Sequence, residues 1–217
     1  MNHLELFSGT HSFGKVSHKL GYNVISLDRD LGGKCPFTNY DNSNNHIQED
    51  IMTWDYKIYP KGYFKLITAS PVCIWWSRCR FSWIGRKIKA HGDTIITNEI
   101  LNRDIELYGV PMVDKVFEII NYFNPQYYII ENPASGKMKE YINDLIPYYD
   151  LDYCIYGFDY RKTTRFWTNI KLQNINRCNH KKHNKSIGGK TDGNVCNKLD
   201  KYKIPEKLIE DILENSY

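Results

Sequence analysis

The hydrophobic pattern predicts short buried strands alternating with amphipathic helices. Apolar runs typical of strands occur at residues 4–7, 24–27, 46–48, 63–68 and 127–130. Helices are expected at 15–20, at 105–123, at 138–146 and after Pro205. Two last strands, at 152–156 and 166–170, are expected to form a hairpin. Together these elements predict an α/β fold, with a doubly wound, mostly parallel sheet and a C-terminal antiparallel hairpin.

Polar side chains stand at the ends of several predicted strands. Asp28 follows the second strand, Asp50 the third and Cys73 the fourth, and Glu131 closes the fifth. In an open α/β sheet, ligands bind outside the carboxyl ends of the strands. The small-residue turn at 8–14 could add backbone N–H groups at a helix N-terminus. Each Asp alone could be a helix N-cap or a turn residue. Polar residues at the ends of successive strands instead favour a nucleoside-binding site.

Two stretches fall outside the regular pattern. Residues 74–97 form a long connection dense in Trp and Arg, which is typical of a functional loop or lid, although its tryptophans could instead pack onto the core. Residues 172–198 are polar and contain paired glycines, which indicates an insertion. We therefore expect a core at 1–171, a small recognition insertion at 172–200 and a closing helical segment at 201–217.

Length and composition fit a globular protein. The 217 residues allow one domain with a substantial core, and 41% hydrophobic and 25% charged residues are ordinary proportions. No segment approaches the roughly 20 apolar residues that a membrane span needs. The N-terminus lacks the basic region and the apolar core of a secretory signal. We therefore expect an intracellular protein with reduced thiols, and a monomer by default.

The formal net charge is +4, and the cations are clustered. One cluster follows Cys73 closely, and the other lies in the polar segment. Clustered cations are typical of a phosphate-binding surface, although solvated loop charges would give the same pattern. The candidates for nucleic-acid contact are Arg78, Arg80, Arg86, Lys87, Lys181 and Lys182.

Five motifs follow one another along the chain. Residues 6–14 read Leu-Phe-Ser-Gly-Thr-His-Ser-Phe-Gly, 70–73 read Ser-Pro-Val-Cys, and 131–136 read Glu-Asn-Pro-Ala-Ser-Gly. Residues 156–169 read Tyr-Gly-Phe-Asp-Tyr-Arg-Lys-Thr-Thr-Arg-Phe-Trp-Thr-Asn, and 202–209 read Tyr-Lys-Ile-Pro-Glu-Lys-Leu-Ile. In content and order the series resembles the cytosine-5 DNA methyltransferases, most closely their compact phage and viral members. The resemblance spans almost the whole chain.

The resemblance implies a Rossmann-like methyltransferase fold that uses S-adenosylmethionine as its methyl donor. It implies that Asp28 holds the ribose and Asp50 the adenine. The other cofactor contacts that it implies are Phe7, Ser8, Gly9, Thr10, His11, Ser12, Phe13, Ile51, Ser70 and Pro71. Two positions depart from the family pattern. His11 stands where many members have glycine, which would crowd the methionine end, and Val72 replaces a second proline.

The resemblance also implies covalent catalysis. Cys73 would add to C6 of cytosine and make C5 enamine-like, and Glu131 would hold the base by N3 and the amino group. Arg161 or Arg165 could orient Glu131 or the base carbonyl. A free thiol has a pKa of about 8.5, so a nearby cation or a helix N-terminus would have to activate it.

The target base must leave the duplex stack to be reached. By its place in the sequence, the segment 75–89 could close over the extruded nucleotide. Cys79 is a rival nucleophile in the same loop, but Cys73 is preferred because Pro71 fixes the strand end before it.

The resemblance implies DNA as the substrate. Only about thirty residues are available for target recognition, and folded or single-stranded RNA would suit so small a segment, so tRNA is the alternative substrate. A binder of nucleic acid or cofactor without turnover is a third interpretation.

The insertion contains Cys178, His180 and His183, and later Cys196. These residue types could form a four-coordinate structural zinc site, which would stiffen a segment too small for its own core. The spacing is irregular, and a lysine-rich loop that contacts DNA is the other interpretation of the segment.

Overall fold

A mixed sheet forms the centre of the molecule. The computed structural model describes residues 1–30, 45–142, 146–173, 175–187 and 200–214. Among these residues, seven strands pair in the order β3-β2-β1-β4-β5-β7-β6. The strands are β1 (Asn2–Leu6), β2 (Asn23–Asp28), β3 (His46–Gln48), β4 (Leu66–Ala69), β5 (Tyr127–Pro133), β6 (Tyr148–Asp152) and β7 (Thr163–Thr168). Strands β1 to β5 pair in parallel, and β7 runs antiparallel to both of its neighbours.

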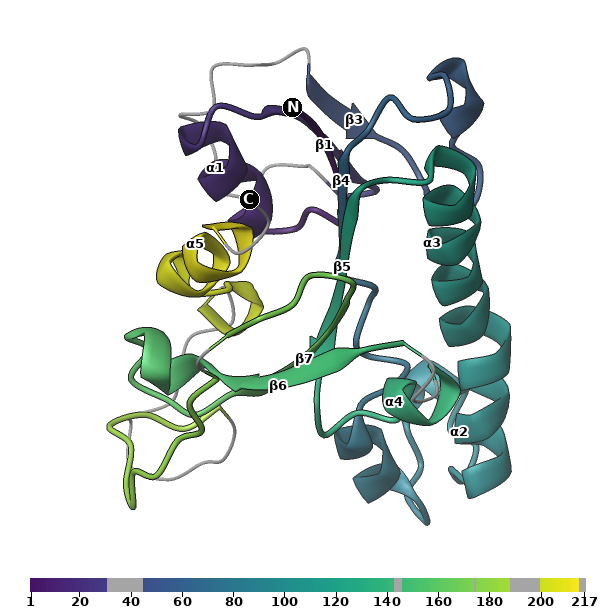
Figure 1. Cartoon of the computed structure of the whole chain (residues 1–217). Helices are drawn as coiled ribbons and strands as arrows, with labels where there is room; N and C mark the ends of the chain where they lie inside the picture. Colours follow the sequence, from purple (N-terminus) through teal and green to yellow (C-terminus); the bar gives the residue numbers. More distant parts are fainter. Residues whose placement is uncertain (31–44, 143–145, 174, 188–199, 215–217) are drawn as a thin grey trace.

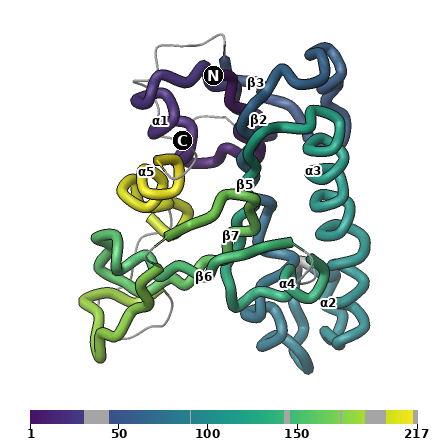
Figure 2. The backbone as a smooth tube through the Cα atoms, viewed as in Figure 1, coloured from purple at the N-terminus to yellow at the C-terminus, as the bar shows by residue number. Residues whose placement is uncertain are grey.

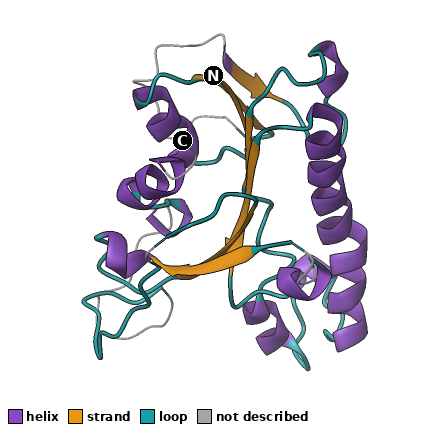
Figure 3. Cartoon of the chain, viewed as in Figure 1, coloured by secondary structure: helices purple, strands orange, loops and turns teal. Residues whose placement is uncertain are grey.

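Helices cover both faces of the sheet, which confirms the doubly wound arrangement (Figures 1 and 3). Helices α1 (Ser12–Lys19) and α5 (Glu206–Glu214) lie on one face, and α3 (Val110–Phe123) runs along the other. Helix α2 (Asn98–Asp104) leads into α3 through a π-helical turn at Ile105–Gly109, and α4 (Met138–Tyr141) is a single turn. Short 3-10 helices occupy Tyr56–Ile58, Arg78–Trp83, Lys89–His91, Tyr153–Tyr156 and Asp200–Tyr202. No helix in the described ranges has the length and apolar character that crossing a membrane requires.

Each face of the sheet has its own hydrophobic core. Helix α3 places Val113, Val116 and Phe123 against one face, at the spacing of a single helical stripe. Helix α5 does the same on the other face with Leu208 and Ile212. The central strands are buried on both faces, which is why they read as continuous apolar runs in the sequence.

The closing segment returns to the first loop of the chain. Figure 2 shows α5 beside α1, at the opposite ends of the colour scale. Lys19 donates to Glu206 at 2.6 Å. The Thr10 hydroxyl donates to the Tyr202 carbonyl at 3.2 Å, and the Ile204 amide donates to the Ser12 hydroxyl at 3.1 Å. The packing of the closing helix on the core agrees with the sequence prediction.

A buried carboxylate fixes the turn between β1 and α1. Glu5 is 3% exposed and accepts hydrogen bonds from the Gly14 amide and the Ser26 hydroxyl, at 2.9 and 2.8 Å. His11 Nδ1 lies 3.3 Å from the same carboxylate. Burial raises the pKa of Glu5, but the hydrogen bond from His11 and its charge outweigh burial and lower the pKa below its usual value. The ionised carboxylate therefore holds the turn and the start of α1 in place.

The C-terminal hairpin differs from its predicted limits. The strands expected at 152–156 and 166–170 are found at Tyr148–Asp152 and Thr163–Thr168. Pairing of β6 with β7 sets Asp150 opposite Arg165, and the two side chains form an ion pair at 2.7 Å. Beyond Asp152 the chain turns into a 3-10 helix that ends at Gly157, where φ is 94°. Tertiary pairing and this glycine override the strand propensity of residues 153–156.

Two helices also differ from their predicted limits. The helix expected at 138–146 ends after one turn, because Ile142 is extended. The helix expected at 105–123 is preceded by α2, whose first turn is capped by the Thr97 side chain accepting from the Ile100 amide. The long loop predicted after Cys73 therefore ends in a helix.

A methyl group at Gly14 should disturb the Glu5 network. A Cβ there would lie 2.5 Å from Glu5 Oε2, a carboxylate held by several hydrogen bonds and unable to move freely. We expect Gly14→Ala to cost about 1–3 kcal/mol and to lower the melting temperature by about 2–4 °C for each kcal/mol lost. Thermal unfolding by circular dichroism measures this. The exposed substitution His18→Ala in the same helix is the control, and equal melting temperatures for both variants would contradict the prediction.

Candidate active site

Cys73 lies in a tight turn just beyond the carboxyl end of β4. The Trp76 amide donates to the Cys73 carbonyl at 3.2 Å and closes the turn. Two hydrogen bonds anchor the residues before it. Asn132 Nδ2 donates to the Pro71 carbonyl at 2.8 Å, and the Ser70 amide donates to the Leu6 carbonyl at 3.2 Å. The thiol is therefore carried on a rigid strand end and is partly exposed.

Glu131 lies near the end of the adjacent strand, β5. Ala69 pairs with Ile130, so Glu131 stands one residue further along, at the level of Ser70. The side chain is buried, and its Oε2 atom has no hydrogen-bond partner among the described residues. Burial raises the pKa of the carboxyl group, against the lowering effects of the Lys162 charge and of a hydrogen bond with Ser70. A buried acceptor with spare capacity is expected where a ligand binds.

The thiol and the carboxylate influence each other directly. Burial raises the pKa of the Cys73 thiol, the Glu131 charge raises it further, and the Lys162 charge opposes both. The structure thus brings together Cys73 and Glu131, which the sequence places 58 positions apart (131 − 73). Groups with perturbed pKa values that meet at strand ends are typical of catalytic sites.

Lys162 is the cation at this site, and sequence reasoning missed it. Its Nζ donates to the Lys201 carbonyl at 2.9 Å and lies 4.9 Å from the centre of the Tyr153 ring. It therefore links the closing segment to the site. The sequence signal that could have identified Lys162 was its place in the 156–169 motif, between Arg161 and Arg165.

The two arginines that were predicted to orient Glu131 are paired with other carboxylates. Arg165 forms a bidentate pair with Asp150, at 2.7 and 2.9 Å. Because Glu131 pairs with Phe166, the neighbouring Arg165 points to the other face of the sheet. Arg161 Nε donates to Asp152 at 3.3 Å. Both arginines thus brace the hairpin, which corrects the prediction that one of them orients Glu131; a contact with the base carbonyl stays a prediction.

The loop after β1 and the ends of β2 and β3 lie along the same edge of the sheet. The Gly9 amide donates to Asp28 Oδ2 at 2.8 Å, and the Asp30 amide donates to Asp28 Oδ1 at 2.9 Å. Asp50 Oδ1 accepts from the Met52 amide at 2.9 Å. Each of these carboxylates keeps further lone pairs for a ligand. The Ser8 hydroxyl is buried and has no partner within the described part of the chain.

Other predicted cofactor contacts have structural roles instead. His11 is 2% exposed, and its ring is turned toward Glu5 and the edge of His46, so it does not crowd the methionine end as expected. Phe13 and Ile51 belong to the two cores, and their contact with the cofactor stays a prediction. The Thr10 and Ser12 hydroxyls bind the closing segment. Phe7 packs against one core from a left-handed backbone conformation, with φ 54°.

The Trp/Arg segment packs largely onto the protein. Trp76 is buried, and Trp75 stacks on Tyr108 with ring centres 4.7 Å apart. Arg80 is 3% exposed, lies over the Trp75 ring and is ion-paired with Asp104. The predicted nucleic-acid contact is therefore wrong for Arg80, whose charge is already neutralised inside the protein. The other five candidate cations are exposed: Arg78, Arg86, Lys87, Lys181 and Lys182.

Three of the four predicted metal ligands come together. Cys178, His180 and His183 lie in one cluster, and the fourth member is Cys154. Cys196 lies outside the described residues.

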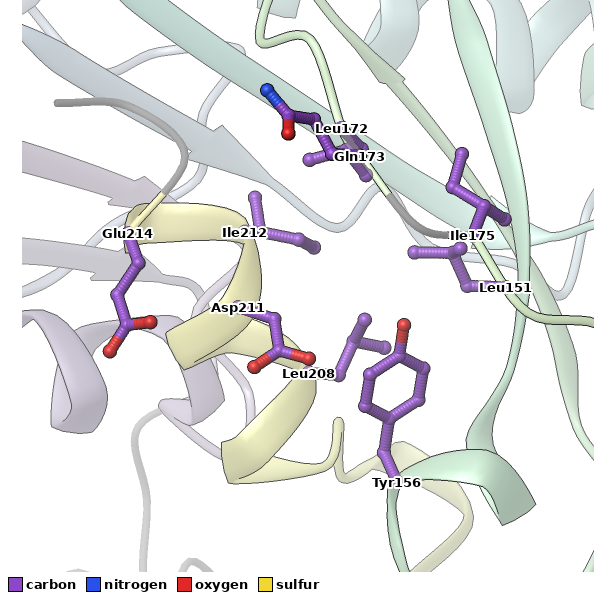
Figure 4. Close-up of a pocket in the computed structure, with 9 residues that line it drawn as sticks. All are labelled: Leu151, Tyr156, Leu172, Gln173, Ile175, Leu208, Asp211, Ile212 and Glu214. Atoms are coloured by element: carbon purple, nitrogen blue, oxygen red, sulfur yellow. The ribbon is translucent and has the colours of Figure 1, made fainter.

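Figure 4 shows a cavity of about 210 Å³. It is lined by Leu151, Tyr156, Leu172, Gln173, Ile175, Leu208, Asp211, Ile212 and Glu214. Its lining comes from α5, from β6 and the 3-10 helix after it, and from the start of the predicted insertion, and it includes none of the predicted catalytic residues.

Comparison with known proteins identifies the family. No family model matches the chain. A protein of Frog virus 3 (isolate Goorha), described as a "Probable DNA (cytosine-5)-methyltransferase", is 36% identical over 174 residues, which are 79% of this chain and 72% of that protein. The chain belongs to the DNA (cytosine-5)-methyltransferase family. The resemblance stated from the motifs is therefore confirmed.

Solved structures confirm the methyltransferase fold. A triple mutant of Spodoptera frugiperda DNMT2 gives a TM-score of 0.51 at 13% identity, covering 85% of this chain and 54% of that one. A prophage-encoded E. coli protein, assigned as a DNA modification methyltransferase, gives 0.50 at 16% identity, covering 77% and 46%. This family member thus spans about half the length of these structures.

The charge on Lys162 should set the ionisation of Cys73. Since the Lys162 charge lowers the thiol pKa, we expect Lys162→Gln to raise that pKa and to move Cys73 alkylation by iodoacetamide to higher pH. Peptide mass spectrometry isolates the reaction of Cys73 from that of the other cysteines. Lys162→Arg should keep the wild-type midpoint, as should the exposed control Lys171→Gln. An unchanged midpoint in Lys162→Gln would contradict this account.

Proposed function

We propose that this chain transfers a methyl group from S-adenosylmethionine to C5 of cytosine in DNA, through a covalent bond between Cys73 and C6 of the base. One observation carries the proposal. A thiol and a buried carboxylate with a free acceptor oxygen meet at the ends of β4 and β5. Membership of the family and the name of the viral relative support DNA as the substrate. DNA and S-adenosylmethionine are intracellular, so the proposed reaction occurs inside a cell.

The buried pair controls when the thiol becomes reactive. With Glu131 ionised, its charge holds the pKa of Cys73 up and keeps the thiol protonated. Burial raises the pKa of Glu131 as well, so the carboxyl group takes up a proton easily. A protonated Glu131 no longer opposes the thiolate, while Lys162 still favours it. The reaction needs an acid at Glu131 and a thiolate at Cys73, and at this site the Lys162 charge favours the thiolate while burial of the thiol opposes it.

The first step joins the sulfur of Cys73 to C6. A lone pair of the thiolate forms the S–C6 bond, the π electrons move toward N3, and N3 takes the proton of Glu131. C5 gains enamine character as a result. When bound, S-adenosylmethionine supplies the electrophilic methyl group that C5 accepts. Loss of the C5 proton to solvent restores the C5–C6 double bond, breaks the S–C6 bond and returns the N3 proton to Glu131.

The residues at the edge of the sheet fit the cofactor. Asp28 would use its further lone pairs to accept from ribose hydroxyls, and Asp50, at the next strand end, would accept from the adenine amine. The unpartnered Ser8 hydroxyl and the Gly9 turn provide polar groups for the remainder of the molecule. These residues would hold the cofactor beside the strand ends that carry Cys73.

The insertion at 172–200 is proposed as the recognition segment, appended to a catalytic core at 1–171 and closed by 201–217. Its exposed Lys181 and Lys182, together with Arg78, Arg86 and Lys87, would contact phosphates. Such contacts predict binding that weakens as salt rises.

Methyl transfer should depend on Cys73 and not on its rival Cys79. We expect labelled methyl from S-adenosylmethionine to appear in duplex DNA as 5-methylcytosine, identified by nucleoside analysis. Cys73→Ala should abolish the transfer, because no thiolate can add to C6. Cys79→Ala should retain it, since Cys79 is exposed in a separate 3-10 helix. Transfer to tRNA in preference to DNA would show that DNA is not the preferred substrate. Label on adenine or on cytosine N4 would refute the proposed addition of Cys73 to C6.

We expect the Glu131 side chain to lower the melting temperature of the protein while it supports methyl transfer. Replacing the buried carboxylate by Gln removes a group whose charged form burial disfavours. We expect Glu131→Gln to lose about 100-fold or more in transfer rate, because N3 receives no proton. We also expect it to melt about 2–4 °C higher, if about 1 kcal/mol is recovered.

The exposed control Glu140→Gln should alter neither the transfer rate nor the melting temperature. The stability gain should fade as the pH falls through the raised pKa of Glu131, because the wild-type side chain is then neutral as well. A lower melting temperature for Glu131→Gln would show that the carboxylate is a stabilising group and would overturn this assignment.

A further inference from the structure

Four potential metal ligands converge where the insertion meets the hairpin. They are Cys154, Cys178, His180 and His183, and their ligand atoms all lie within 4.8 Å of one another. Cys178 Sγ is 3.3 Å from His183 Nε2. Cys154 comes from the 3-10 helix after β6, whereas the other three come from the segment 175–187. The 3-10 helix after β6 and the segment 175–187 therefore meet at this cluster.

The cluster has the composition and size of a closed zinc site. Two sulfurs and two imidazole nitrogens are a ligand set that favours Zn²⁺. A tetrahedral ion with bonds of about 2.3 Å to sulfur and about 2.0 Å to nitrogen holds neighbouring ligand atoms about 3.3–3.8 Å apart. The ligand atoms here lie within 4.8 Å of one another, so small side-chain movements would bring them to these distances. Four protein ligands leave no open position, which is typical of structural zinc.

The surroundings of the cluster hold Cys178 in place without the metal. Asp152 is fully buried at the end of β6 and accepts from the Cys178 amide at 2.9 Å and from Arg177 Nε at 3.1 Å. Arg177 also donates to the Asp150 carbonyl at 3.0 Å. Further along, the Lys185 amide donates to the Asp159 carbonyl at 3.0 Å. Polar contacts thus align the segment along the hairpin with its ligands facing Cys154.

We propose that Cys154, Cys178, His180 and His183 bind one structural zinc ion that fastens the insertion to the end of β6. In residues 175–187 no side chain is buried, so hydrophobic packing does not fix the segment. A metal supplies folding free energy where a core is too small to do so. Because Lys181 and Lys182 lie between the two histidines, the ion would also fix the position of two exposed cations.

The proposed ligand set differs from the one that the sequence suggested. Spacing alone connected Cys178, His180 and His183 to the downstream Cys196. The hairpin instead brings Cys154 to them from 24 positions upstream (178 − 154). Its contribution was hidden because residues 152–156 were expected to continue a strand.

Metal analysis of the full-length chain tests the proposal. The protein is purified without chelator, and inductively coupled plasma mass spectrometry should find about one zinc per chain. Cys154→Ser should lower zinc affinity at least about tenfold, since it removes a ligand. Cys79→Ser is the matched control and should keep the metal. Cobalt substitution provides a second readout, because the absorption bands report how many thiolates bind the ion.

Chelation separates a metal defect from a folding defect. Removing zinc from the wild type should speed tryptic cleavage at Lys181 and Lys182, while far-ultraviolet circular dichroism of the core stays unchanged. The proposal is overturned if the wild type binds no zinc, if it binds iron instead, or if Cys154 and Cys178 form a disulfide. It is also overturned if Cys154→Ser binds zinc as tightly as the wild type. None of these outcomes depends on whether the chain transfers methyl groups.

Discussion

The proposed chemistry depends on one buried carboxylate beside one thiol. Burial works against the charged forms of both Glu131 and Cys73, and the Glu131 charge works against the thiolate. The pair is therefore costly to keep ionised, and Lys162 offsets only part of that cost. Such a pair does not stabilise the fold. The packing and hydrogen bonds of the surrounding strands keep the two side chains together. Its chemistry becomes favourable when a base that accepts a proton at N3 and an addition at C6 enters between the two groups.

The sheet provides the rigidity that this pair needs. Strands β4 and β5 are central and buried, and Asn132 bridges their ends through the Pro71 carbonyl. On the neighbouring strand, Glu5 ties the first loop to α1, which fixes the edge where Asp28 and the Gly9 turn lie. The closing segment then reaches back to the same loop and to Lys162. Residues far apart in sequence thus converge on one edge of the sheet, where parallel strands present their carboxyl ends.

Sequence patterns predicted most of this frame, for identifiable reasons. The central strands and α3 have strong periodic signals. Cys73 and Glu131 stand at predicted strand ends, and the resemblance of their motifs to the family singled them out. The misses have physical causes. Residues 148–156 favour strand throughout, so only pairing with β7 and the turn at Gly157 decide where β6 ends. One motif contains three cations, Arg161, Lys162 and Arg165, and the sequence does not say which of them faces Glu131. The strand pairing turns Arg165 to the other face of the sheet, and Asp150 and Asp152 bind the two arginines, which leaves Lys162 beside Glu131. Similarly, the burial of Arg80 depends on Asp104, 24 positions away.

The central claim is that Cys73 bonds to a pyrimidine ring held by Glu131, and covalent trapping tests it most directly. Duplex DNA containing 5-fluorocytosine is incubated with the protein and S-adenosylmethionine, and fluorine at C5 blocks the elimination that would release the sulfur. The account predicts a complex that survives denaturation, with the nucleotide attached to the peptide that contains Cys73, and a much lower yield from Glu131→Gln. No adduct with a protein that transfers methyl groups to DNA, or an adduct at Cys79, would contradict it.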